Sequence, residues 1–365
     1  MAQVFGRSWS KDELRRRVGD VSQLCGVERV VLDDGAARGS RAAIVRTGGG
    51  LEAEVLLDRA MDLGRVSFNG AALGFRAPCG DVHPSFYEEQ GVGWLRSFSG
   101  LLATCGLQNV GGPCEDGGLA HGVHGRINNT PAEQISVEQE WQGDEYAIRL
   151  RGKMREVTAL GLFGPNLTLT RTLSTALGAD WIELSDTVEN EGFSEAALLL
   201  LYHINVGFPV VDDGARLLAA VRKTEPRDET AKPGLKAWDR FEAPQAGYAE
   251  QVFFHEMIPD AQGRVQTAIV SPERAGKRLA LCVDYDPATL PKFIEWKQMG
   301  AGPYTVGLEP ANCLVMGRAT ERAQRGLTML KPGERKSFSV KLRALADEAS
   351  IGKLEDELAK RGGRA

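Results

Sequence analysis

Along most of the chain, hydrophobic and polar positions alternate with a period of two, which is typical of half-buried β-strands. Such runs include "EAEVLL", "YAIRLRGKM", "LTLTRTLST", "WIELSDTVEN" and "SFSVKLRAL", and turns rich in the chain's 43 glycines and 16 prolines separate them. The stretches between the runs do not show the longer helical period that parallel βαβ folds require. The pattern therefore predicts an all-β protein, a large antiparallel sandwich or barrel.

Helical signals occur near the two ends of the chain. In "SWSKDELRRR", Ser10 stands three residues before Glu13, which is the spacing of an N-terminal capping box. Near the C-terminus, "GKLEDELAKRGG" predicts a short charged helix that ends at glycines. We expect one domain over residues 1–365, with an N-terminal extension over 1–40 and a C-terminal helix within 345–365.

One long segment departs from the strand pattern. Residues 222–250 are rich in charged residues and proline, which is typical of irregular chain. We expect an excursion that forms a lid or an edge loop.

Composition and charge narrow the class of protein. The 365 residues are 42% hydrophobic, and the net charge of −5 comes from interspersed acidic and basic residues, without the basic block that nucleic-acid binding needs. The longest apolar run, "AALLLLYHINVGFPVV", is shorter than a membrane span, and the charged N-terminus lacks the apolar segment of a signal peptide. The six cysteines are scattered, as reduced thiols in a cytosol are. We expect a cytoplasmic protein without nucleic-acid or membrane partners. A homodimer is compatible with the sequence.

The stretch "LAHGVHGRINN" places His121 and His124 three residues apart. On a helix this spacing would put both rings on one face and could hold a metal, but the glycines around them disfavour a helix, and in extended chain the two rings point in opposite directions. We therefore expect no metal site. Arg126, Asn128 and Asn129 follow directly, and such donors in a glycine-rich loop suit contacts with sugar hydroxyls, although a solvated loop is the plainer interpretation.

Two further residues suit acid–base chemistry. His203 lies in the apolar run, where alternation places it on a face with leucines, so it is either a core histidine bonded to a carbonyl or a proton-transfer group with a shifted pKa. In "GPYTVGLEPANC", Glu309 shares a strand face with Thr305 and Gly307, which suggests a cleft, although an ordinary strand-end glutamate remains the alternative.

Other polar residues could form a second wall of such a site. The candidates are Arg96 beside aromatic residues, Gln108 and Asn109 among glycines, and Glu295, Trp296 and Lys297 in "FIEWKQMG". Charged residues are usually solvated, so a role as surface or core residues stays open for each of them.

Three of these motifs together carry a resemblance. In their order and spacing, "HGVHGRINNTPAE", "LLYHINVGFP" and "VGLEPAN" resemble the galactose mutarotase-like superfamily, closest to an uncharacterised bacterial branch of the aldose 1-epimerase family. "TCGLQNVG" adds to it, and the similarity runs from about Ala42 to Leu345. The resemblance implies an antiparallel β-supersandwich with the site in a cleft on its concave face.

The resemblance also implies roles for individual residues. His203 matches the family's general acid, Glu309 its base, His124 its first sugar-binding histidine and, less securely, Arg96 its early arginine. His121 has no counterpart. The family's sugar-binding aspartate also lacks one, and Glu295, Lys297 or a residue of the excursion could replace it.

The implied activity is that of an aldose 1-epimerase, which interconverts the α and β anomers of a sugar by acid–base ring opening and needs no cofactor. An alternative is an epimerase that acts at another carbon or on a keto, acidic or sulfonated sugar, which His121, Arg126 and Lys297 would suit. A non-catalytic carbohydrate-binding protein on the same fold is a third possibility, but it would need no acid–base pair.

Overall fold

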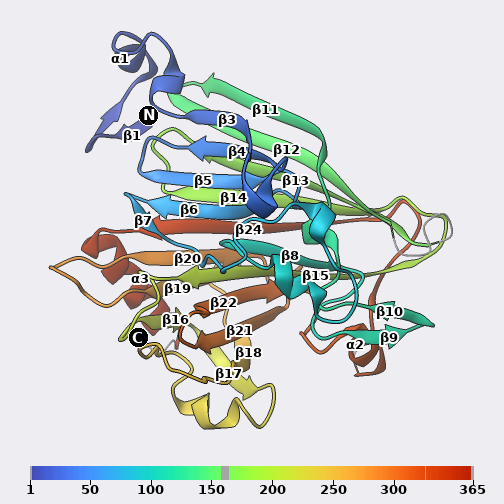
Figure 1. The fold of residues 1–365 in the computed structure, drawn as a ribbon. Coiled ribbons are helices and arrows are strands. Elements are labelled where there is room, and N and C mark those ends of the chain that lie inside the picture. The colour runs from blue at the N-terminus through green and yellow to red at the C-terminus, as the bar shows by residue number, and fades with distance from the viewer. Residues whose placement is uncertain (1, 158–163, 325, 363–365) are drawn as a thin grey trace.

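Antiparallel β-sheets dominate the structure, a computed structural model that describes residues 2–157, 164–324 and 326–362 (Figure 1). The largest sheet has eight strands. In spatial order they are β11 (Glu133–Gln142), β12 (Glu145–Val157), β13 (Asn166–Ala176), β14 (Trp181–Asn190), β24 (Arg335–Leu345), β20 (Ala280–Tyr285), β19 (Val265–Val270) and β16 (Arg216–Ala219). Each neighbouring pair is antiparallel, which confirms the expected all-β supersandwich.

Two more sheets complete the sandwich. The seven-stranded sheet contains β17 (Val221–Pro226), β18 (Gln251–Met257), β21 (Lys292–Met299), β22 (Tyr304–Ala311), β15 (Ala196–Gly207) and β23 (Thr328–Leu330), and β8 (Leu102–Leu107) pairs with β15. The five-stranded sheet contains β3 (Gly26–Val31), β4 (Arg41–Arg46), β5 (Leu51–Leu56), β6 (Asp62–Phe68) and β7 (Ala71–Ala72). Two short hairpins pair β1 (Ala2–Val4) with β2 (Arg7–Trp9), and β9 (Cys114–Asp116) with β10 (Leu119–His121).

The main hydrophobic core lies between the eight-stranded sheet and the other two sheets. It brings together buried side chains from β13, β14 and β24 on one side and from β5, β6, β15 and β22 on the other. Burial of this apolar surface is the dominant force that holds the layers together.

Strand β15 is the central element for the site. All twelve of its residues are buried, and its side chains alternate between two cores. Leu200, Tyr202 and Ile204 belong to the main core, whereas Leu199 and Leu201 belong to a smaller cluster on the opposite face. His203 points to the second face with these leucines, as the sequence pattern predicted, because side chains of a strand alternate with a period of two.

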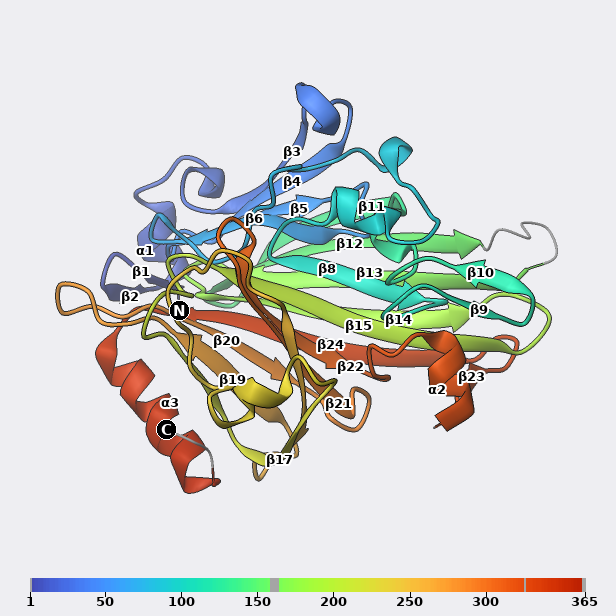
Figure 2. The same cartoon turned by 60° about the horizontal axis from the view of Figure 1, so that its bottom comes forward.

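Three α-helices are described. α1 (Lys11–Arg15) begins at Ser10 with the capping box that the sequence predicted, and α3 (Glu348–Lys360) is the predicted C-terminal helix. Figure 2 shows α3 along one flank of the molecule, where its apolar residues pack on β16, β19 and β20. α2 (Arg318–Gln324) was not predicted.

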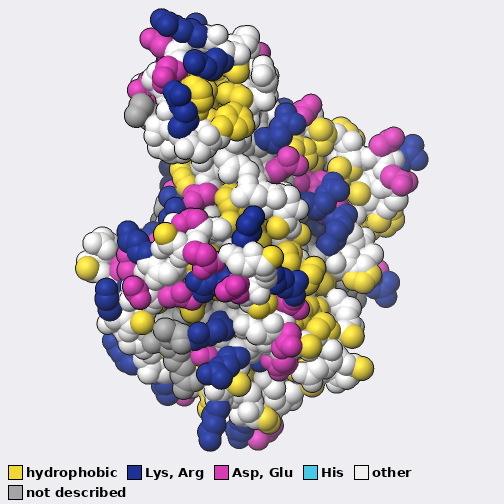
Figure 3. Space-filling view, turned by 90° about the vertical axis from the view of Figure 1, so that its left-hand side faces the viewer, with side chains coloured by type: hydrophobic (Ala, Val, Ile, Leu, Met, Phe, Trp, Pro, Cys, Tyr) yellow, Lys and Arg dark blue, Asp and Glu magenta, His cyan; other side chains and the backbone are white. Residues whose placement is uncertain are grey.

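The segment 222–250 is irregular over most of its length, as expected. It starts within the edge strand β17 and contains a short 3-10 turn at Lys232–Lys236. All six cysteines are free thiols. Among the helices of the described residues, none has both the length and the apolar character to cross a membrane. On the face shown in Figure 3, basic and acidic side chains are interspersed.

Candidate active site

A cleft opens on the face of the seven-stranded sheet that points away from the main core. Its volume is about 320 Å³. The polar side chains that line it are His124, His203, Arg227, Glu250 and Glu309, and the aromatic ones are Trp94, Phe98 and Trp296. The cleft therefore brings both proposed acid–base residues together with one predicted sugar-binding histidine.

His203 and Glu309 stand directly opposite each other on the neighbouring strands β15 and β22. The register that pairs Ile204 with Leu308 and Leu201 with Ala311 makes them cross-strand neighbours. Nε2 of His203 lies 3.1 Å from Oε1 of Glu309, and both side chains are almost fully buried. An imidazole and a carboxyl group at this distance can exchange a proton.

Gly307 leaves the space that this pair occupies. It lies on β22, opposite Asn205 of β15 and Trp296 of β21. A Cβ atom at Gly307 would lie 2.7 Å from Oε1 of Glu309 and 3.0 Å from Cε1 of His203. A larger residue would thus push the two groups out of their present positions.

Aromatic side chains surround the imidazole of His203. The ring of Trp296 lies 5.4 Å from it and that of Phe98 5.1 Å, both edge to face. Trp94 stacks on Phe98 with 4.9 Å between ring centroids. These apolar surfaces exclude water from the acid–base pair and offer flat faces to a ring-shaped ligand.

His124 completes this wall from the loop between β10 and β11. Its backbone has a φ of +56°, and backbone hydrogen bonds with Gly106 and Gly111 hold it in this uncommon conformation. Its ring lies 4.8 Å from Trp94 and 5.7 Å from His203. Burial lowers the pKa of His124 to about 4, so the ring is neutral at pH 7.

Burial shifts the pKa values of the acid–base pair in opposite directions. Burial, and then the neighbouring His124, lower the pKa of His203 to about 3, while Asn205 has a smaller opposite effect. Burial raises the pKa of Glu309 well above its ordinary value, Glu250 adds to this, and Arg227 opposes it. Because both shifts favour the neutral forms, the pair carries one proton over a wide range of pH.

Arg227 and Glu250 reach the cleft from the two ends of the irregular segment. Glu250 accepts hydrogen bonds from Trp296 Nε1 at 2.7 Å and from Arg227 at 3.2 Å. Arg227 also binds Asp228 at 2.7 Å. The segment thus supplies the charged side chains of Arg227 and Glu250 to the cleft. They are hydrogen-bonded to each other, and Glu250 is also hydrogen-bonded to Trp296.

Three predicted site residues lie away from this cleft. The side chain of Arg96 is 75% exposed and pairs with Glu88 at 3.1 Å. Glu295 and Lys297 flank Trp296 on β21 but point to the other side of the sheet. Glu295 is bound there by His255 at 3.1 Å, and Lys297 by backbone carbonyls and by Glu242 at 2.8 Å.

The remaining predicted residues line a separate cavity. His121, Arg126 and Asn109 surround it together with Glu156, whose pKa burial raises to about 7. The side chain of Asn109 binds the carbonyls of Gly112 and Gly122, so it supports the loop. His121 and His124 therefore face different cavities.

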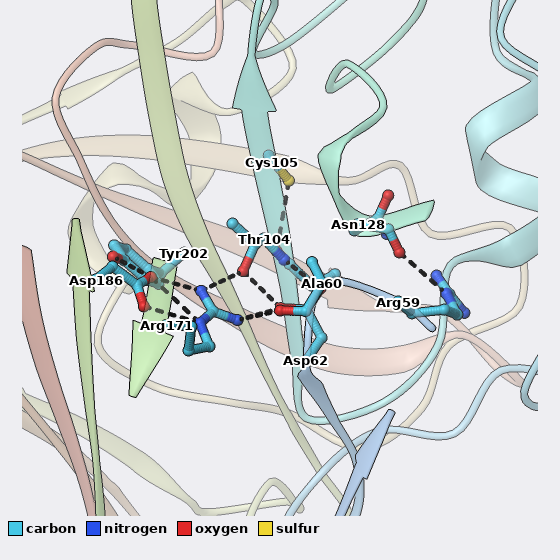
Figure 4. A network of polar contacts seen from close by, with 10 residues as sticks. Arg59, Ala60, Asp62, Thr104, Cys105, Asn128, Arg171, Asp186 and Tyr202 are labelled. Atoms are coloured by element: carbon cyan, nitrogen blue, oxygen red, sulfur yellow. Dashed lines mark hydrogen bonds and ion pairs between the residues drawn. The ribbon is translucent and has the colours of Figure 1, made fainter. Parts of the chain in front are cut away.

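The two asparagines of the "HGRINN" motif are buried and hold the aromatic wall. Oδ1 of Asn128 accepts a hydrogen bond from Trp94 Nε1 at 2.7 Å, and Oδ1 of Asn129 accepts one from Ser97 at 3.2 Å. Arg59 binds the carbonyl of Asn128 from behind (Figure 4). The sequence left open contacts with sugar hydroxyls or a solvated loop for these residues, and in the structure their side chains bind the protein.

A buried ionic network fixes the strands behind the cleft (Figure 4). Arg171 donates hydrogen bonds to Asp186 at 2.7 Å and to Thr104 of β8 at 2.9 Å. The hydroxyl of Tyr202 donates to the same aspartate at 2.8 Å. Because Tyr202 precedes His203 on β15, the network anchors the strand that carries the imidazole.

Sequence reasoning did not single out Trp94, Phe98, Arg227 or Glu250. The two aromatics flank Arg96 in "WLRSF", and their spacing around a charged residue was the available signal. Arg227 and Glu250 lie near the two ends of the irregular segment. Arg227 directly follows strand β17 and Glu250 directly precedes strand β18, and these two strands pair. A prediction of this strand pair from the sequence would have identified both residues as neighbours.

The chain is similar to one protein family and to several solved structures. Residues 37–344 match the sequence model of a family described as a domain of unknown function, DUF4432. No match was found among curated proteins. The crystal structure of a candidate aldose 1-epimerase from Klebsiella pneumoniae is similar with a TM-score of 0.84 and 27% identity, over 92% of this chain and 87% of that one.

Two more distant crystal structures share the fold. A galactose mutarotase-like protein from Clostridium acetobutylicum has a TM-score of 0.59 and 15% identity, over 89% of this chain and 100% of that one. A galactose 1-epimerase from Lactobacillus acidophilus has a TM-score of 0.54 and 12% identity, over the same shares. These two structures show the same fold, and together with the family match and the Klebsiella pneumoniae structure they agree with the resemblance to the galactose mutarotase-like superfamily.

Proposed function

Because the chain belongs to the DUF4432 family, whose fold it shares with proteins named as aldose 1-epimerases, we propose that it interconverts the α and β anomers of an aldose. The observation that carries this proposal is the cross-strand pair of His203 and Glu309 inside an aromatic cleft. Ring opening of a cyclic sugar needs one base and one acid close to the anomeric centre, and this pair supplies both.

The proposed reaction opens the ring by two proton transfers. Glu309 takes the proton of the anomeric hydroxyl, and the electrons of that O–H bond form the carbonyl at C1. The bond between C1 and the ring oxygen breaks, its electrons go to the ring oxygen, and His203 protonates that oxygen. The aldehyde then rotates and the same steps run in reverse on its other face. Both groups regain their starting protonation states, so no cofactor or co-reactant is required.

The proposed roles require that His203 carries the shared proton and that Glu309 is a carboxylate when the reaction starts. Burial in the cleft favours the neutral pair, with the proton on Glu309. Transfer of this proton to Nε2 of His203 gives a carboxylate and an imidazolium, which is the form the proposed reaction uses. Sugar hydroxyls that donate hydrogen bonds to the carboxylate stabilise this charged form.

The other cleft residues suit the binding of a sugar ring. Trp94 and Trp296 provide flat apolar surfaces, and carbohydrates pack the C–H faces of their rings on such surfaces. His124 and the pair of Arg227 and Glu250 offer donors and acceptors for hydroxyl groups. We propose these five residues as the substrate-binding set.

The rival functions fit the geometry less well. A binding protein would gain nothing from a carboxyl group and an imidazole kept out of water, because burying such groups is costly. The residues that favoured an anionic sugar, His121, Arg126 and Lys297, lie outside the cleft. Epimerisation at another carbon would also use an acid–base pair, but its product is a different sugar, whereas anomer exchange leaves the sugar the same.

The test is NMR exchange spectroscopy on a panel of neutral aldoses, which measures the exchange rate between the α and β anomers. We expect acceleration for at least one aldose with the parent protein and loss of it with Glu309→Gln. Glu295→Gln serves as the matched control, because Glu295 also contacts a buried histidine at 3.1 Å but lies outside the cleft. No acceleration with any aldose, or new signals from a different sugar, would overturn the proposal.

A further inference from the structure

We propose that Arg227 and Glu250 act on Glu309 as two opposed charges: the guanidinium favours its carboxylate form, and the neighbouring carboxylate disfavours it. Neither residue transfers a proton, so in this role both are positioning residues for the proton that His203 and Glu309 share. The irregular segment 222–250 carries both charges and thereby sets the pH range in which the cleft works. This inference rests on the proposed function and adds the regulation of its acid–base pair.

The two charges reach the cleft from the edge of the seven-stranded sheet. Arg227 directly follows β17 and Glu250 directly precedes β18, and these two strands pair. The backbone N–H of Arg227 donates to the carbonyl of Val252 at 2.9 Å, which fixes the point where the arginine leaves the sheet. Both side chains line the same cleft as Glu309.

Hydrogen bonds hold both charges in place. Oε1 of Glu250 accepts from Arg227 at 3.2 Å, and Oε2 accepts from Nε1 of Trp296 at 2.7 Å. Nε of Arg227 donates to Asp228 at 2.7 Å. The side chains of Arg227 and Glu250 are 25% and 43% exposed, so water screens them in part, whereas Glu309 is buried. A fixed charge acts more strongly on a buried carboxyl group than on a solvated one, because less water separates them.

The other titratable groups around Glu309 supply no fixed charge at neutral pH. His203 of β15 shares its proton with Glu309. Burial lowers the pKa of His124 to about 4, so this ring is neutral. Burial raises the pKa of the Cys105 thiol on β8 well above its ordinary value, so the thiol is protonated. The charged residues of β21 point to the other side of the sheet. Among the described groups that face Glu309, the two charges of the irregular segment therefore decide the balance.

These two charges act in opposite directions. Burial raises the pKa of Glu309 most, the carboxylate of Glu250 raises it further, and the guanidinium of Arg227 lowers it. Without the charge of Glu250, the pair of His203 and Glu309 should lose its proton at lower pH. Without the charge of Arg227, the pair should lose it at higher pH. Since the proposed reaction needs that one proton, the pH at which activity falls should move in the same way.

The experiment follows kcat/KM for anomer exchange as a function of pH. Glu250→Gln removes the charge but keeps an oxygen that can accept the hydrogen bond of Trp296. We expect the fall in kcat/KM with rising pH to occur about 0.5 pH unit or more lower in this variant, and higher by a similar amount in Arg227→Gln. Arg227→Lys keeps the positive charge and should keep the parental midpoint.

Two exposed charges in the same part of the chain provide matched controls. The side chain of Glu229 is 86% exposed and pairs with Lys232, and that of Arg222 is 67% exposed and pairs with Glu256. Neither is among the described residues that line the cleft. Glu229→Gln and Arg222→Gln should leave the midpoint within about 0.2 pH unit, because water and salt screen exposed charges. A role in sugar binding alone would lower kcat/KM at every pH without moving the midpoint.

A titration without sugar separates this inference from the proposed function. In protein labelled with 13C at the glutamate carboxyl groups, NMR follows the ionisation of Glu309, whose signal is the one missing in Glu309→Gln. If no aldose is anomerised but this midpoint moves down in Glu250→Gln and up in Arg227→Gln, the proposed function fails and the inference stands. A Glu309 midpoint that stays or moves the other way in either variant overturns the inference. So does an active enzyme whose kcat/KM midpoint is the same in all variants.

Discussion

His203 and Glu309 face each other across two antiparallel strands, with Nε2 3.1 Å from Oε1. His255 and Glu295 form a second pair with the same 3.1 Å separation on the other side of the sheet. The two pairs share residue types, distance and burial, and differ in that both members of the first pair line the candidate cleft. The second pair is therefore a matched control for the pair that we propose as catalytic.

Substitutions in the two pairs should have different consequences. Glu309→Gln and His203→Asn should each lower anomer exchange by about a hundredfold or more, because each removes a proton-transfer group. Glu295→Gln should leave kcat within about threefold, since its carboxyl group does not reach the cleft. Polarimetry on the best substrate, with circular dichroism to check folding, measures both. Equal losses in the two pairs would contradict the assignment.

His124 and His121 should also differ. His124→Ala should raise KM and lower kcat together, because the ring lies 5.7 Å from His203 and helps to form the wall that orients the sugar. His121→Ala should cost less than about tenfold, since His121 lines a separate cavity. Steady-state kinetics of the two variants decides this, and a larger effect of His121→Ala would show that the second cavity takes part in the reaction.

Activity should decline as pH rises through the raised pKa of Glu309. The reactive pair needs one proton, and above the raised pKa of Glu309 the pair has none, so kcat/KM should fall as pH rises through that pKa. Below it, kcat/KM should stay level until pH approaches the pKa of His203, about 3, as long as the protein remains folded. The pH profile is measured after subtraction of the uncatalysed rate. A profile that rises steadily with pH would be incompatible with this proton count.

Glu309→Gln should stabilise the protein at high pH although it lowers activity. A carboxyl group with a raised pKa in the folded state costs stability as pH rises from its unfolded value, near 4.5, through its folded value. The amide carries no such cost. The variant's advantage should therefore be small near pH 4.5 and grow by up to about 1.4 kcal/mol per pH unit above it. Urea unfolding at pH 5 and pH 8 compares the two proteins, and a constant difference would exclude a raised pKa.

Gly307→Ala should impair turnover more than folding. The added Cβ would approach Oε1 of Glu309 to 2.7 Å, and a shift of the pair by a few tenths of an ångström disturbs proton transfer. We expect a loss of about tenfold or more in kcat. Gly352→Ala in α3 is the control, because a Cβ there meets no atom within 4 Å. A fully active Gly307→Ala would mean that the pair has room to move.

The sequence predicted the fold through local patterns. Alternation identified the strands and the face on which His203 lies, and the Ser10 capping box marked α1, because these signals depend on neighbours a few residues away. α2 escaped notice because it is short, follows a glycine and lacks a predicted cap. Neither local pattern brings His203 and Glu309 together, and the resemblance predicted this pair.

The surroundings of the pair could not be predicted in the same way. Alternation puts Glu295 and Lys297 on one face of β21 and Trp296 on the other, but strand pairing over long distances decides which face meets the cleft. Arg227 and Glu250 come close together only because β17 and β18 pair. Such contacts depend on register between distant segments, which no short window of sequence contains.

Both faces of β15 are buried, so substitutions on either face should affect the protein, but in different ways. In a scan of all single substitutions, even-numbered positions such as Leu200 and Tyr202 should govern how much folded protein accumulates in the cell, because they pack in the main core. His203, on the other face, should affect turnover per molecule with less effect on accumulation. Leu199 and Leu201 share the face of His203 but pack in the smaller cluster, so along this single strand His203 should stand out as the position where substitutions reduce catalysis more than yield.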